Sequence, residues 1–237
     1  MLPGQIKASV NSWLKSTFGA NTGILSMHPV GGGSINQAVQ LKTTRGAFFL
    51  KYNSRSKYPD MFITEKKGLE QLGATQTLVV PKVEDQQETS DYSYLVLEWL
   101  EHMAPYTSLW EEAGQKLALL HQNSDSAFGL GYNNYIGSLN QTNTRMPEWI
   151  DFLVSTRLEP LMKQAFDEKL FNRTDFAAFE KLCSRLSQLL PLEKPSLLHG
   201  DLWNGNFITS SAGPCLIDPA IYYGHREMDI AMTKLFG

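Results

Sequence analysis

A polar loop flanked by two short apolar stretches is the feature that most limits what this chain can fold into. Residues 197–206 have the sequence LLHGDLWNGN, and Asn206 stands five positions after Asp201. A second acid, Asp218, stands twelve positions after Asn206, directly behind the apolar residues 215–217. Phosphoryl transfer needs a carboxylate that accepts the proton of the attacking hydroxyl, and an amide and a carboxylate that hold Mg²⁺. Asp201, Asn206 and Asp218 match these roles in type, order and spacing; the alternative is a polar loop in which Asp201 only satisfies backbone amides.

The first hundred residues are patterned mainly as antiparallel strands. Apolar residues at helical spacing predict a first helix over 6–18, and a second helix is predicted over 60–72. The polar stretch 84–91 is assigned to the turn between the last two strands. The predicted strands are 24–30, 35–41, 47–52, 78–83 and 92–97.

The remainder of the chain is mainly helical. A compact strand-loop-strand unit at 196–218 interrupts it and contains the polar loop. The chain is therefore predicted to have an α+β, two-lobed fold, with a β-rich N-lobe at 1–98, a hinge at 99–103 and a mainly helical C-lobe at 104–237. The helices predicted in the C-lobe are 110–121, 148–166, 176–190 and 227–236.

Three features of the N-lobe gain weight from their order along the chain. A glycine-rich turn between the first two strands would let backbone amides approach phosphate oxygens, although a plain hairpin turn is the alternative. Lys51 ends the third strand, where a phosphate-pairing lysine belongs, but it could equally be an exposed edge lysine. Glu65 on the next helix could pair with Lys51 or be one more exposed carboxylate. The residues of the glycine-rich turn are Gly31, Gly32, Gly33 and Ser34.

Composition and charge exclude several classes of function. The net charge is −3, and no cluster of Lys and Arg interleaves with aromatic residues, so nucleic acid is not an expected partner. No apolar run is long enough to span a membrane, and the N-terminus lacks the apolar core of a signal peptide, so a cytoplasmic location and no membrane partner are expected. Cys183 and Cys215 have no metal-ligand spacing and are expected to be small buried residues.

The segment HGDLWNGNF at 199–207 resembles the catalytic loop of the fructosamine kinases, which are relatives of the aminoglycoside and choline kinases. The resemblance covers nearly the whole chain and implies a protein-kinase-like fold. The further stretches that carry it are GGGSIN at 31–36, FFLKYN at 48–53, MFITE at 61–65, YIGSLNQTNT at 135–144 and LIDPAIYYGHREMDIAM at 216–232.

The resemblance implies a kinase that uses ATP and Mg²⁺ to phosphorylate the 3-hydroxyl of the sugar in ketoamines, free or protein-bound. The phosphorylated adduct is unstable, so the reaction amounts to deglycation. A monomer or weak homo-oligomer is expected. Carried over to this chain, the resemblance makes Asp201 the catalytic base and places Trp203 beside the sugar, with a core aromatic as the alternative for Trp203. The implied metal ligands are Asn206 and Asp218, the implied phosphate contact is Lys51 paired with Glu65, and the implied backbone contacts to adenine are Glu98, Trp99 and Leu100.

The chain departs from the family pattern in two places. Ser34 stands where some members have a cysteine that can join two subunits, so no disulfide is expected through this loop. The family continues for several helices beyond the position of Gly237, and the last predicted helix is unusually apolar, so the C-lobe is expected to be incomplete or to self-associate. The open alternatives are a kinase for another small alcohol, such as an aminoglycoside or choline, and a catalytically incomplete nucleotide-binding fragment.

Overall fold

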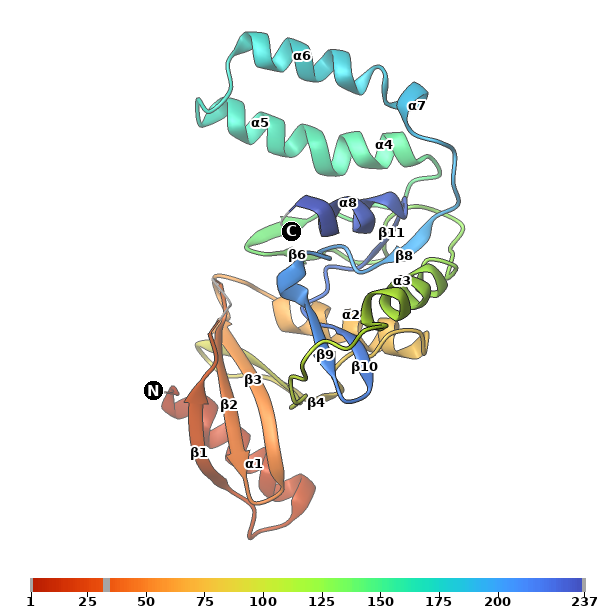
Figure 1. Ribbon diagram of the computed structural model, residues 1–237. Helices are drawn as coiled ribbons and strands as arrows, with labels where there is room; N and C mark the ends of the chain where they lie inside the picture. Colours follow the sequence, from red (N-terminus) through yellow and green to blue (C-terminus); the bar gives the residue numbers. More distant parts are fainter. Residues whose placement is uncertain (1, 32–34, 236–237) are drawn as a thin grey trace.

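The structure is a computed structural model that describes residues 2–31 and 35–235. Figure 1 shows a sheet-containing half at the bottom and a helical half above it, as the predicted two-lobed α+β fold requires. In the described part of the chain, no helix is both long enough and apolar enough to cross a bilayer.

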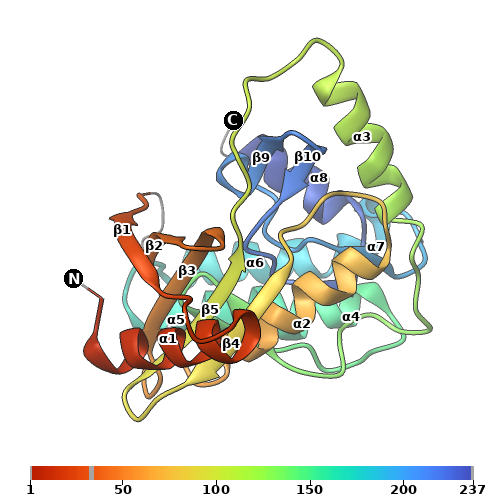
Figure 2. The same cartoon turned by 90° about the horizontal axis from the view of Figure 1, so that it is seen from below.

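The N-lobe is built on a five-stranded antiparallel sheet in the order β1-β2-β3-β5-β4. Helix α1 covers one face of this sheet and helix α2 covers the other. Successive side chains of a strand point to opposite faces, and β5 accordingly gives Tyr94 and Val96 to the cluster under α1, and Leu95 and Leu97 to the cluster under α2. Figure 2 shows α1 lying across the strands. The elements are α1 Gly4–Phe18, β1 Ile24–Pro29, β2 Gln37–Thr43, β3 Gly46–Ser54, α2 Met61–Ala74, β4 Val83–Glu88 and β5 Tyr92–Glu98.

The strand predicted over 78–83 is wrong in position. Strand β4 begins at Val83 and occupies the polar stretch that was assigned to a turn. It lies at the edge of the sheet and pairs with β5 alone, so polar side chains are tolerated on it and an apolar alternation is not needed. Val79, from the predicted strand, instead forms an isolated bridge to Cys215 and so joins the N-lobe to the C-lobe.

Two of the helices predicted in the C-lobe are interrupted. The helix predicted over 148–166 is α4, one turn of π-helix at Val154–Leu158, and then α5. The helix predicted over 176–190 is α6 followed by the short α7. The bounds are α3 Leu109–Leu120, α4 Trp149–Leu153, α5 Glu159–Asp167, α6 Arg173–Cys183, α7 Leu186–Leu189 and α8 Glu227–Leu235.

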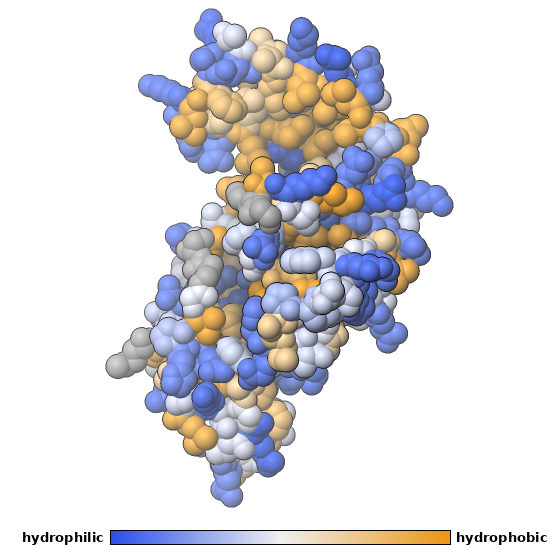
Figure 3. Space-filling model, viewed as in Figure 1, coloured by the Kyte–Doolittle hydropathy of each residue, from blue (hydrophilic) through white to orange (hydrophobic). Residues whose placement is uncertain are grey.

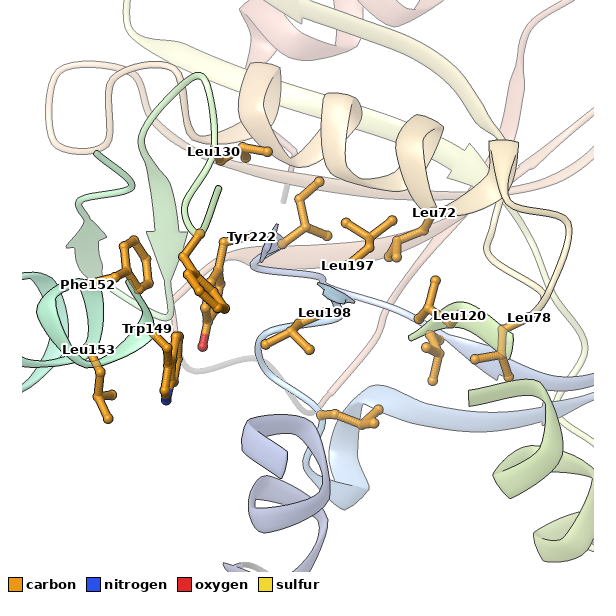
Figure 4. Close-up of a cluster of buried hydrophobic side chains, with 14 of the residues drawn as sticks. Leu72, Leu78, Leu120, Leu130, Trp149, Phe152, Leu153, Leu197, Leu198 and Tyr222 are labelled. Carbon is orange, nitrogen blue, oxygen red and sulfur yellow. The ribbon is translucent and has the colours of Figure 1, made fainter. Parts of the chain in front are cut away.

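Three short strand pairs support the loops that face the N-lobe. β8 pairs with β11, β9 with β10 and β6 with β7, all antiparallel. The largest apolar cluster lies behind them, where Leu197 and Leu198 of β8 meet Leu72 of α2 and Tyr222 of β11 (Figure 4). Both ends of the polar loop are thus anchored in a packed core. The strands are β6 Asn134–Ile136, β7 Leu139–Gln141, β8 Ser196–Leu198, β9 Phe207–Ser210, β10 Gly213–Leu216 and β11 Tyr222–Gly224.

Apolar side chains are exposed on the helical half. On α8, Ile230 is 39% exposed and Leu235 is 68% exposed. Figure 3 shows further hydrophobic surface at the end of the molecule formed by α5 and α6. That the C-lobe is incomplete or self-associates stays a prediction. Of the two cysteines, Cys215 is buried as expected, whereas Cys183 is partly exposed because it ends α6 on this open side.

Candidate active site

A cleft of about 460 Å³ collects the candidate residues of both lobes. Lys51 and Glu65 come from β3 and α2 of the N-lobe. From the C-lobe come the polar loop between β8 and β9 and the turn after β10. Residues 167 positions apart in the chain are thereby brought into hydrogen-bond contact. The predicted residues on its walls are Gly31, Lys51, Glu65, Asp201, Trp203, Asn206 and Asp218.

Lys51 is held between two carboxylates. Its side chain is 3% exposed, and its Nζ lies 2.5 Å from Glu65 Oε1 and donates to Asp218 Oδ1 at 2.8 Å. Burial alone would lower the pKa of Lys51, but the charges of Asp218 and Glu65 outweigh it and raise that pKa. Burial raises the pKa of Glu65 to about 7 against the opposing effect of Lys51. The ammonium is therefore permanent at neutral pH, and the alternative of an exposed edge lysine is wrong.

Asp201 and Asn206 form a second pair on the opposite wall. Asn206 Nδ2 donates to the Asp201 backbone carbonyl at 2.9 Å and to Asp201 Oδ2 at 3.0 Å. A single turn of 3₁₀-helix over Asn204–Asn206 brings the amide back over the acid. Burial raises the pKa of Asp201, and His199 and Asn206 oppose this rise. Asp201 is thus a positioned carboxylate that is more basic than an exposed aspartate.

The turn that carries Asp201 is held from below by buried groups. Asp229, which is 1% exposed, accepts hydrogen bonds from the backbone N–H of His199 and of Gly200, both at 2.9 Å. His121 Nε2 lies 2.9 Å from the same carboxylate. His199 Nε2 donates to the Ile217 carbonyl at 3.0 Å, which leaves its Nδ1 to accept from the Asp201 N–H. This geometry supports a structural role for His199 and Asp229.

Two backbone conformations in this region depend on residue type. Gly200 has a φ of +82°, and a Cβ there would lie 2.1 Å from the carbonyl oxygen of Ala220. Glycine is therefore required where the two loops meet. Asp218 has a φ of 55°, in the left-handed region that aspartate and asparagine enter more readily than other residues with a Cβ. Its carboxylate is 45% exposed and faces the cleft.

Comparison with known proteins agrees with the site. The sequence model of the fructosamine kinase family matches residues 6–237. The chain belongs to the fructosamine kinase family. It is 39% identical over 228 residues to a "probable ketoamine kinase" of Synechocystis sp., covering 94% of this chain and 76% of that protein. It is 36% identical over 237 residues to the chloroplastic "protein-ribulosamine 3-kinase" of Arabidopsis thaliana, covering 96% of this chain and 71% of that protein.

Solved structures show the same fold. The "putative fructosamine-3-kinase" of Haemophilus somnus superposes with a TM-score of 0.86 at 29% identity, covering 96% of this chain and 76% of that one. An aminoglycoside phosphotransferase crystallised with AMP-PNP and hygromycin B gives a TM-score of 0.65 at 16% identity, covering 94% and 75%, and shows the fold alone. The predicted kinase-like fold is confirmed, and the chain is a phosphotransferase with a hydroxyl acceptor.

Some predicted residues of this fructosamine kinase family member are not among the described residues that line the cleft. Gly32, Gly33 and Ser34 lie outside the described residues. Residues 98–100 follow the end of β5 and are not among the described residues that line the cleft; there, the indole N–H of Trp99 donates to Glu101 Oε1 at 3.0 Å. The predicted adenine contacts of Glu98, Trp99 and Leu100 stay predictions. Trp203 is 36% exposed on the cleft wall, so the alternative of a core aromatic is wrong.

Sequence reasoning missed the hairpin formed by β6 and β7 as part of the site. Asn134, Tyr135 and Gly137 line the cleft, although in the sequence residues 135–144 are marked only by the family resemblance. An Ile-Gly-Ser turn between two short polar stretches was the available signal.

The donor set fits a magnesium ion that is shared with a nucleotide. Among residues 2–31 and 35–235, no three His, Cys, Asp or Glu side chains are grouped to hold a metal ion. Mg²⁺ in kinases is bound through one or two protein oxygens together with substrate phosphates and water, so a cage of three protein ligands is not needed. The exposed carboxylate of Asp218 and the side-chain amide of Asn206, both on the cleft wall, could supply two such oxygens.

Proposed function

We propose that the protein is an ATP- and Mg²⁺-dependent ketoamine kinase that phosphorylates the 3-hydroxyl of the sugar, and so takes part in deglycation. The observation that carries the proposal is the meeting of Asp201 and Asn206 with Asp218 and Lys51 in one cleft. This is the constellation that phosphoryl transfer requires. Family membership supplies the substrate class, because relatives named ketoamine kinase and protein-ribulosamine 3-kinase match most of the chain.

Each residue has a role that its geometry supports. The Lys51 ammonium binds phosphate oxygens, and Glu65 keeps the lysine directed into the cleft. Asp218 and Asn206 would hold the magnesium ion, which would supply positive charge to neutralise the phosphates. Asp201 accepts the proton of the sugar hydroxyl while the hydroxyl oxygen forms a bond to the γ-phosphorus. The bond between this phosphorus and the leaving oxygen of ADP breaks at the same time.

The inner part of the cleft suits a purine ring. Three apolar residues line the cleft there: Val30 directly after β1, Ala38 in β2 and Ile217 after β10. A planar base can lie between such walls, while Lys51 faces its phosphates. This arrangement supports ATP as the phosphoryl donor.

The alternative of an aminoglycoside kinase lacks a supporting feature in the described part of the cleft. A polycationic acceptor would be favoured by several acidic groups free to bind its amines. The carboxylates that line the described cleft are Glu65, Asp201 and Asp218, and each already serves the lysine, the hydroxyl or the metal. A ketoamine needs no such cluster because its reacting part is a neutral sugar.

The deciding experiment is an ATP-consumption assay with ribulose-lysine, fructose-lysine and a panel of aminoglycosides. Turnover of either ketoamine, with formation of its 3-phosphate, is the expected result. Asp201→Asn should lower this turnover by roughly 10²–10⁴-fold while ATP binding stays near that of the wild type, because the base acts on the acceptor. Turnover of aminoglycosides alone, or a fully active Asp201→Asn variant, would contradict the proposal.

A further inference from the structure

The β6–β7 hairpin has a place in the site but no role in the chemistry described so far. Its strands pair in register from Asn134 opposite Gln141 to Ile136 opposite Leu139. The hairpin belongs to the C-lobe, yet Tyr135 and Gly137 near its tip line the cleft beside the N-lobe. The question is what such an element does there.

A buried amide network fixes the base of the hairpin. Asn134 Nδ2 donates to the Ile221 carbonyl at 2.8 Å, and Gln141 Nε2 donates to the Ala220 carbonyl at 3.0 Å. The Asn134 Oδ1 accepts from Gln141 and from Asn143, both at 2.9 Å. These three amide side chains are at most 4% exposed. A satisfied buried network is rigid, so the hairpin moves together with the segment that follows the metal-binding acid.

A half-buried arginine reinforces this base from the π-helical turn. The guanidinium of Arg157 donates to Asn143 Oδ1 at 2.6 Å and to the Thr142 carbonyl at 2.5 Å. It lies 4.7 Å from the ring centre of Phe152 and 4.5 Å from that of Tyr222. Because the planar cation is stacked and hydrogen-bonded at once, its position is tightly defined.

The tip of the hairpin contacts the N-lobe at two points. The Tyr135 hydroxyl donates to the Pro59 carbonyl at 3.0 Å, and its ring meets Tyr58 edge-on at 6.2 Å. Burial raises the pKa of Tyr135, so the hydroxyl keeps its proton for this bond. Gly137, with a φ of +57°, lies so close to Ile35 that a Cβ there would be 3.3 Å from the isoleucine Cδ1.

Pro59 lies two residues before α2, the helix that carries Glu65, the ion-pair partner of Lys51. Asp60 turns the chain with a φ of 59°, and its carbonyl accepts the backbone N–H of Thr64 in the first turn of α2. Glu65 follows directly and pairs with Lys51. A displacement of Pro59 is thus passed to Glu65 through less than two turns of helix.

We propose that Tyr135 is a positioning residue that closes a ring of contacts around the phosphate end of the cleft, and that it sets nucleotide affinity through α2. On the N-lobe side, Asp218 contacts Lys51, Lys51 contacts Glu65, and α2 connects Glu65 to Pro59 just ahead of the helix. On the C-lobe side, the Tyr135 hydroxyl links Pro59 to the hairpin, and the buried amides link the hairpin to the segment after Asp218. The inference rests on the proposed function because it assumes that nucleotide phosphates bind beside Lys51.

The groups proposed to bind the nucleotide come from both lobes. Nucleotide binds to the arrangement in which both lobes present their groups at once, so the measured affinity falls when that arrangement is less populated. The Tyr135 hydroxyl of the C-lobe donates a hydrogen bond directly to the Pro59 carbonyl of the N-lobe. Its loss should therefore weaken nucleotide binding without disturbing the core of either lobe.

The test measures the affinity for Mg²⁺ with AMP-PNP by calorimetry, which needs no acceptor. Tyr135→Phe should raise the dissociation constant about 3- to 10-fold, the effect expected of one hydrogen bond, with an unchanged melting temperature of the free protein. Tyr106→Phe is the matched control, since its hydroxyl also makes an exposed hydrogen bond, to Glu112 at 2.6 Å, but away from the cleft. It should bind like the wild type.

A double-mutant cycle separates action through α2 from other effects. If Tyr135 acts through Glu65, Tyr135→Phe should have little further effect on affinity in a Glu65→Gln background. Unchanged affinity in Tyr135→Phe, full additivity with Glu65→Gln, or an equal loss in Tyr106→Phe would each overturn the inference. If the wild-type protein bound no nucleotide at all, the proposed function would fail first, so the two failures are distinguishable.

Discussion

Asp229→Asn tests how much of the active site depends on one buried carboxylate. Asp229 accepts the backbone N–H groups of His199 and Gly200 and pairs with His121. An asparagine keeps the shape but has one accepting oxygen, so its amide nitrogen must face a donor. Hydrogen bonds to charged groups contribute about 1.5–3 kcal/mol, and a buried N–H left without a partner costs about 1–3 kcal/mol. Discounting for relaxation and overlap of the two effects, we expect a loss of about 2–4 kcal/mol in the free energy of unfolding.

The loss should be visible in both stability and catalysis. Urea unfolding of Asp229→Asn should show a lower midpoint than the wild type, and turnover should fall because the turn that carries Asp201 is no longer held. Glu227→Gln is the matched control, since Glu227 is an exposed acid in the first turn of the same helix. If Asp229→Asn unfolded within about 0.5 kcal/mol of Glu227→Gln, a typical surface substitution, the claim that Asp229 supports the turn would be refuted.

Three further predictions address the chemistry. Lys51→Met should lower kcat/KM for ATP by roughly 10²-fold, since a charge-stabilising group is lost; wild-type kinetics would remove Lys51 from the phosphate site. Asp218→Asn should raise the Mg²⁺ concentration needed for half-maximal nucleotide binding more than Asn206→Ala does, because Asp218 brings a full charge. An unchanged Mg²⁺ titration for Asp218→Asn would exclude Asp218 as a ligand. Because burial raises the pKa of Asp201 above the usual aspartate value of 3.8 and the base must be ionised, kcat/KM should fall as the pH is lowered through that pKa. Asn206→Ala should raise this pKa further, because it removes a hydrogen bond that favours the ionised carboxylate.

Features set by local spacing could be predicted from the sequence. The first helix follows from apolar residues at helical spacing, and Ile6, Val10 and Leu14 are indeed buried against the sheet. Asp201 and Asn206 are close in the chain, so the loop itself brings them together. The order of glycine-rich turn, strand lysine and helix glutamate, which is that of a kinase, predicted that Lys51 and Glu65 pair. The structure has this ion pair, which neither residue could indicate alone.

Features set by neighbours distant in the sequence could not be predicted. β4 is a strand because β5 offers it an edge, and its polar sequence carries no strand pattern. The π-helical turn in the helix predicted over 148–166 lies where Arg157 reaches the end of β7, a contact that no periodicity reveals. Tyr135 became a site candidate only when the fold brought it to Pro59.

The distance in sequence between Lys51 and Asp218 has a consequence for the synthesis of the chain. The N-lobe sheet is made largely from strands that are neighbours in the sequence, so it can form while the C-lobe is still being translated. At that stage Lys51 has Glu65 as a partner, but Asp218 lies 167 positions further along the chain and is not yet made. The C-lobe residues that line the cleft around Lys51 are missing as well, so its ammonium is open to water. We therefore expect Lys51 to become buried, and the active site to be completed, only when the chain beyond β10 has emerged from the ribosome.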